Sequence, residues 1–224
     1  MTARFSSHML ERYIAPGISA FTSADIPDMS DHDPESSYWV ANHFLSSIFR
    51  AGYHLPMGAH IQHYLRRSEA AFAEHARARE ATLSFLEAGG QSPTSYSNAL
   101  LHWEYFLGQS WHAHLLLRQV LRLMSGDDTL NVFEPDDGSA EQRLNLLYNA
   151  MKHVESRIDA GQIPENATSP VWLSNRGLEC TDGHLTFHET AAILHFLAKW
   201  AHVFVDPKEV AHKVEALRQE SPPD

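Results

Sequence analysis

Two asparagines and a histidine align on one face of a predicted helix in the second half of this 224-residue chain. Asn145, Asn149 and His153 are each four residues apart, a spacing that places them in one stripe along an α-helix. Asparagine is unfavourable in helix interiors, which favours a chemical role for this stripe, and a merely solvated face is the alternative. An amide can orient an imidazole, and an imidazole transfers protons near neutral pH. Lys152, beside the histidine, can stabilise an anion such as phosphate.

Two other groups of residues, both rich in histidine, are weaker candidates for a functional site. Cys180, His184 and His188 have the spacing C-x3-H-x3-H, and both residue types are zinc ligands, but a fourth ligand is not obvious. His188, His195 and His202 recur every seven residues, about 10.5 Å apart along a helix, which is too far to share one ion. We expect the edge of a packed helix there, with a pH-sensitive interface as the alternative. We therefore predict neither a metal site nor a cofactor.

The helix that carries the Asn–His stripe has its own start signal and its own core face. Ser139 stands three residues before Gln142, the pattern of a capping box, and Gly161 is the expected end. The apolar residues of this helix recur at i, i+3, i+4 and i+7 and predict a buried stripe. They are Leu144, Leu147, Tyr148, Met151, Val154 and Ile158.

The rest of the chain predicts an all-α bundle of about five to seven helices. We expect residues 1–32, rich in Pro, Ser and Asp, to form an irregular N-terminal arm, and residues 33–224 to form a single helical domain. Capping residues, prolines and glycines delimit the further helices. They are 34–51, 58–88, 95–124, one from Thr186 and one from Pro207. Near 165–185 the pattern of apolar residues around a Ser-Asn-Arg-Gly turn predicts a short hairpin or ordered loop.

Composition limits the classes of partner. The formal net charge is −11, and no run of basic residues is present, so we expect no recognition of DNA sequence. A single cysteine excludes an internal disulfide. No apolar stretch is long enough to span a membrane, and the N-terminal residues lack a signal-peptide core, so we expect a cytoplasmic protein. One helix, around Trp103, Tyr105, Phe106 and Trp111, is apolar nearly all round and predicts either full burial or half-burial in a homodimer.

The helical organisation and the Asn-x-x-x-His spacing resemble the HEPN superfamily, whose domains occur in many prokaryotic toxins, abortive-infection proteins and CRISPR effectors. The family's motif is Arg-polar-x-x-x-His, and its active members are metal-independent ribonucleases that pair two motifs across a dimer. Asn149 and His153 match the second and last motif positions, while Tyr148 stands where the family has arginine. The resemblance implies His153 as general acid/base, Asn149 as its orienting residue and Lys152 as an accessory cation. A phenol does not carry the positive charge of arginine. The sequence therefore fits an inactive relative of these ribonucleases as well as an active one.

Two classes of function follow from the sequence. The first is a HEPN-like protein of bacterial defence or toxin–antitoxin type, either a ribonuclease acting on RNA as a homodimer or an inactive relative. The second is a non-catalytic all-α module that binds a protein or a small ligand. The acidic charge and Tyr148 favour the second class, and the aligned Asn–His stripe favours the first. A groove that holds Asn149, His153 and Lys152 would indicate a site, whereas a convex wet face would not.

Overall fold

A computed structural model of the chain describes residues 4–32, 38–49, 56–206, 209–210, 212–213 and 215. The predicted all-α bundle is confirmed, with seven helices within the described residues. The helices are α1 (Ser7–Tyr13), α3 (Trp39–Phe49), α4 (Met57–Glu87), α5 (Pro93–Ser125), α6 (Ala140–Lys152), α7 (Val154–Asp159) and α8 (Phe187–Val205). Two 3-10 turns, η1 (Ile18–Ala20) and η2 (Ser30–His32), and three short strands complete the described elements.

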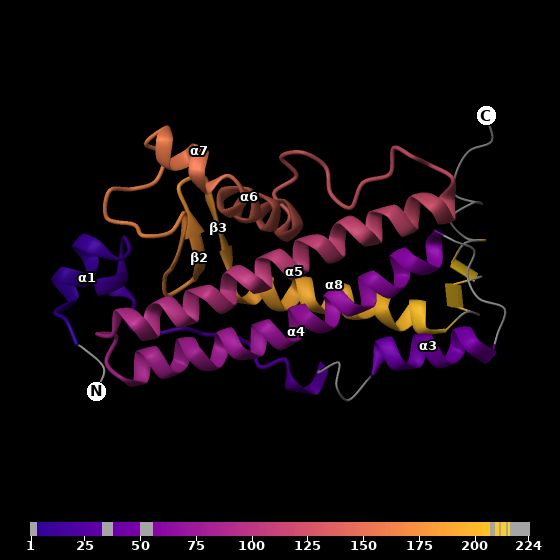
Figure 1. Cartoon of the computed structure of the whole chain (residues 1–224), viewed down its shortest axis with the longest axis horizontal. Coiled ribbons are helices and arrows are strands. Elements are labelled where there is room, and N and C mark those ends of the chain that lie inside the picture. The colour runs from indigo at the N-terminus through magenta and orange to yellow at the C-terminus, as the bar shows by residue number, and fades with distance from the viewer. Residues whose placement is uncertain are drawn as a thin grey trace.

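The two longest helices, α4 and α5, form an antiparallel hairpin along the whole molecule (Figure 1). Gly89 and Gly90 both have positive φ angles and end α4, because a left-handed backbone suits glycine. Ser92 then caps α5 by accepting a hydrogen bond from the Ser95 amide, and Pro93 occupies the first helical position. Both helices begin and end within a few residues of the predicted bounds. Helix α8 packs against both of them.

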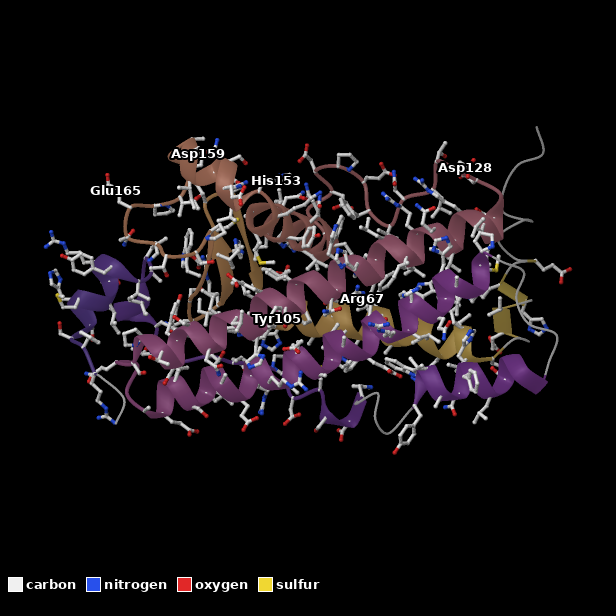
Figure 2. The ribbon with its side chains drawn as sticks, viewed as in Figure 1. Arg67, Tyr105, Asp128, His153, Asp159 and Glu165 are labelled. Carbon is white, nitrogen blue, oxygen red and sulfur yellow. The ribbon has the colours of Figure 1, made fainter. Side chains whose placement is uncertain are left out.

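Large aromatic side chains fill the space between α4, α5 and α8, and two of them form buried hydrogen bonds there. Trp103 is fully buried and donates from its indole N–H to the Thr82 hydroxyl at 3.0 Å. Tyr64 is also fully buried and donates to the Leu197 carbonyl of α8 at 2.7 Å. Such bonds let an aromatic ring be buried without leaving a polar atom unpaired. Tyr105, by contrast, is exposed on α5, so this aromatic helix is buried on one side only (Figure 2).

The predicted hairpin near residues 165–185 is confirmed, and a third strand extends it. Strands β1 (Val171–Leu173), β2 (Gly177–Cys180) and β3 (Gly183–Thr186) form an antiparallel sheet in the order β1-β2-β3. Leu178 lies opposite both Leu173 and Leu185, and all three are buried. The sheet and helices α6 and α7 gather over the first half of α5 (Figure 1).

The N-terminal arm is more ordered than the sequence predicts. It contains α1 and both 3-10 turns, and its residues Leu10, Ile18 and Phe21 belong to the same core as the bundle. The Asn175 side chain fixes it by accepting from the Thr22 amide at 2.9 Å. Three contacts then join the segment that leads into α3 with helix α8. From one contact to the next, the position advances by seven residues in both segments. The contacts are Asp25–His188, His32–His195 and Trp39–His202.

Two predicted helix starts fall wholly or partly outside the described residues. The Asp33–Pro34 cap lies outside them, and α3 itself begins at Trp39. Pro207 is also outside, although the Val210 amide donates to the Asp206 carbonyl, as in the first turn of a helix. Among the described residues, we find no helix whose length and apolarity suit the crossing of a membrane.

Candidate functional site

Helix α6 carries the predicted motif, and it is shorter than predicted. Its start is as expected, because the Ser139 hydroxyl accepts from the Gln142 amide at 3.1 Å. Its end is not, because His153 leaves helical geometry and α7 follows as a separate helix, so the prediction of one continuous helix to Gly161 is wrong. The Ser156 hydroxyl donates to the His153 carbonyl at this break. Such a local side-chain bond competes with a regular helical ladder.

The residues of the predicted apolar stripe differ in burial, because the helix breaks after α6. Leu144 and Leu147 are fully buried, in agreement with the prediction. Met151 packs partly against the core. Ile158, which the stripe also places in the core, is 62% exposed on α7, so that prediction is wrong. The physical reason is that the turn at His153 shifts the face of α7 relative to that of α6.

The three predicted catalytic residues differ in burial, since Asn149 is half-buried whereas Lys152 and His153 are exposed. The half-buried Asn149 donates from its amide nitrogen to the Asn145 side-chain oxygen at 2.9 Å. Lys152 and His153 are exposed where α6 ends (Figure 2). The His153 backbone amide donates to the Asn149 carbonyl at 3.1 Å. Within the described chain we find no hydrogen bond between the two side chains, because the Asn149 amide nitrogen is directed toward the preceding turn. The catalytic roles of His153, Asn149 and Lys152 stay predictions.

Tyr148, at the position where the resembled family has arginine, packs inward against α5. Its hydroxyl lies 3.1 Å from His112 Nε2, and its ring centroid lies 5.9 Å from that of Trp111. Burial lowers the pKa of His112, and the positive charge of Arg67 lowers it further. Tyr148 therefore joins α6 to α5 through an aromatic and a polar contact.

Arg143, a second cation of α6, joins this helix to α8. It forms an ion pair with Glu189 and donates to the Gly138 carbonyl. Glu189 also completes the capping box of α8 with Thr186, as predicted. Burial alone would raise the pKa of Glu189, but the Thr186 amide and the Arg143 guanidinium lower it overall. This arrangement supports helix packing.

A cavity of about 200 Å³ lies between α5 and residues 131–135. The segment that follows α5 turns back along it (Figure 1), and Arg122 holds this segment by donating to the Leu130 carbonyl at 2.8 Å. Trp111 lines the cavity and contacts Phe133 of the returning segment, with ring centroids 5.9 Å apart. The same Trp111 contacts Tyr148, so α6 supports one wall of the cavity.

His114 and Arg118 also line this cavity, and each has a buried nitrogen without a partner. Within the described part of the chain, neither His114 Nε2 nor Arg118 Nε makes a hydrogen bond. Buried polar groups are nearly always hydrogen-bonded, so two such atoms beside one cavity mark a candidate binding site. Sequence reasoning did not find it. The available signal was a histidine and an arginine four residues apart on the most apolar helix.

Two histidines of the predicted seven-residue series, His188 and His195, contact the N-terminal segment. His188 lies 3.0 Å from Asp25, and the His195 ring lies edge-on to His32. Cys180 is buried, and burial raises the pKa of its thiol. Among the described residues, no three His, Cys, Asp or Glu side chains are placed to hold a metal ion.

Comparisons of the chain with protein-family models, curated proteins and solved structures returned no match. The HEPN-like relationship therefore depends on the helical organisation and on the short motif from Tyr148 to His153, and it stays a prediction.

Proposed function

We propose that this protein is a non-catalytic, ligand-binding helical module of HEPN-like type. Its binding site is the cavity between α5 and residues 131–135. The observation that carries the proposal is that His114 and Arg118 both line this cavity and that each keeps, among the described residues, a buried nitrogen without a hydrogen-bond partner. A ligand that bonds to such groups recovers hydrogen-bonding free energy that the protein alone does not gain.

The contacts of the motif helix support this choice over catalysis. Tyr148 contacts His112, Asn149 bonds to Asn145, and Arg143 pairs with Glu189. A general acid/base works best when a neighbouring group fixes its orientation. Tyr148 and Arg143 instead connect α6 to α5 and α8, whereas the Asn149–Asn145 bond lies within α6. Through its contact with Trp111, Tyr148 also supports the wall of the cavity.

The experiment is a binding measurement with small aromatic probes by ligand-observed NMR, using phenol, benzamide and benzoate. We expect at least one to bind the wild type and none to bind Val132→Trp, whose indole would fill the cavity. Glu134→Trp is the matched control, because Glu134 is exposed on the same segment and does not line the cavity. Binding that survives Val132→Trp in a folded protein, or no binding by the wild type, would overturn the proposal.

The ribonuclease is a second candidate, favoured by the exposure of Lys152 and His153 side by side at the end of α6. An imidazole and an ammonium in that position can reach an RNA backbone, and pairing two copies would require a homodimer. The test is cleavage of a mixed RNA pool with chelator present by the wild type, His153→Ala and His184→Ala. His184 is exposed on β3 and serves as the matched control. Cleavage lost only in His153→Ala would establish the nuclease, and equal or absent cleavage would eliminate it.

A further inference from the structure

The cavity between α5 and residues 131–135 combines one positive charge with a largely apolar wall. Arg118 is the charged residue among the described residues that line it. No described acid forms an ion pair with Arg118, and its Nε is buried without an acceptor. The apolar lining residues are Trp111, Leu115, Val132, Phe133 and Pro135. A guanidinium against an apolar wall favours an anionic ligand with an apolar body.

His114 does not add a second charge to the cavity at neutral pH. Its Nδ1 donates to the Ser110 carbonyl at 2.8 Å, and its ring stacks on Phe196 with centroids 5.5 Å apart. Burial lowers the pKa of His114, although the Ser110 carbonyl and the charge of Glu141 act in the opposite direction. Glu141 does not line the cavity. The positive charge offered to a ligand is therefore that of Arg118.

The size and shape of the cavity restrict the ligand further. A volume of about 200 Å³ corresponds to about seven water molecules at roughly 30 Å³ each, below the usual range for a drug-sized ligand. Trp111 and Phe133 both line the cavity, and an aromatic side chain suits packing against a flat apolar body. A carboxylate matches a guanidinium because both are planar and form two parallel hydrogen bonds.

We infer that the ligand is a small, flat monocarboxylate whose carboxylate binds Arg118 and whose apolar body packs against Trp111 and Phe133. This inference rests on the proposed function, since it assigns a chemical class to the ligand of the same cavity. The bidentate pair would give selectivity for the anion over an uncharged molecule of the same shape.

The test compares dissociation constants, measured by NMR titration, for benzoate, benzamide and benzylamine, which share a ring but differ in charge. We expect benzoate to bind at least about tenfold more tightly than benzamide, since hydrogen bonds to charged groups are the stronger ones, and benzylamine to bind most weakly. Arg118→Gln should abolish this preference, and Arg118→Lys should retain part of it. Arg66→Gln, at an exposed position on α4, controls for the loss of one positive charge and should leave the preference unchanged.

The possible results distinguish failure of the carboxylate inference from failure of the proposed ligand-binding function. Equal affinities for benzoate and benzamide, both lost in Val132→Trp, would overturn the carboxylate class and leave the ligand-binding function intact. A preference for benzoate that persists in folded Arg118→Gln would overturn the role of Arg118. Failure of phenol, benzoate, benzamide and benzylamine to bind the wild type would overturn both proposals.

Discussion

His75 on α4 gives the sharpest quantitative prediction, because it is a titratable group inside the core. The side chain is 1% exposed and its ring lies edge-on to Trp103 and Phe106, with centroids 5.4 and 5.6 Å away. Its Nε2 has no hydrogen-bond partner among the described residues. Burial lowers the pKa of His75 to about 4, and the charge of Arg79 contributes, while that of Asp28 acts against the change.

The expected loss of unfolding free energy on acidification follows from the difference between the pKa values of His75 in the folded and unfolded chain. The unfolded histidine titrates near 6.5 and the folded one near 4, so between these values the unfolded chain binds more protons. Stability therefore rises with pH across this window and falls as the solution is acidified. The full difference corresponds to about 3 kcal/mol, of which about 2 kcal/mol is lost between about pH 7 and about pH 4.5.

The assay is urea unfolding of the wild type and His75→Phe at both pH values. Phenylalanine keeps the contacts with Trp103 and Phe106, and a cavity of about 140 Å³ beside His75 leaves room for the larger ring. We expect the variant to lose about 2 kcal/mol less than the wild type on acidification. His63→Phe, at an exposed position on the same helix, should lose as much as the wild type. An equal loss in His75→Phe and the wild type would refute the reasoning that burial keeps this imidazole uncharged.

Two further predictions concern the small sheet and its junction with α8. Gly177→Ala should destabilise the fold by about 2 kcal/mol or more, measured by the urea midpoint, because an added Cβ would lie 2.1 Å from the Leu185 carbonyl oxygen. Thr186→Ala removes the hydroxyl that caps α8 and should lower the free energy of unfolding by about 1 kcal/mol, whereas Thr186→Ser should retain most of it. A change within error for either alanine variant would contradict the corresponding contact.

The parts of the fold that local chemistry determines were predictable from the sequence. The glycines after α4 and the Thr186–Glu189 capping box act within a few residues of one another, so their pattern is visible in a short window. The third strand, β3, was missed because its four residues run directly into α8, and so short a segment carries little periodicity. The order of the N-terminal arm was missed because it comes from contacts with distant residues such as Asn175.

The cavity could not be predicted from local pattern, because it forms only where the segment after α5 returns along that helix. Two tertiary contacts fix this return, from Arg122 to the Leu130 carbonyl and from Trp111 to Phe133. His114 and Arg118 are visible in the sequence as a pair four residues apart, but their lack of partners is a property of the packed structure. A histidine and an arginine on the most apolar helix of the chain are nevertheless a pattern worth testing first, since neither is usually buried unpaired.

The motif helix shows why a polar stripe can arise without catalysis. Asn145 and Asn149 are four residues apart and bond to each other, so they reduce the helical disadvantage of asparagine by pairing along one face. Arg143 and Tyr148 use their polar atoms to attach α6 to α8 and α5. Each of these side chains thus has a structural partner that a sequence alone does not reveal. The contact of Tyr148 with Trp111 then connects this helix to the cavity, so the residue at the arginine position of the resembled motif here supports the wall of that cavity.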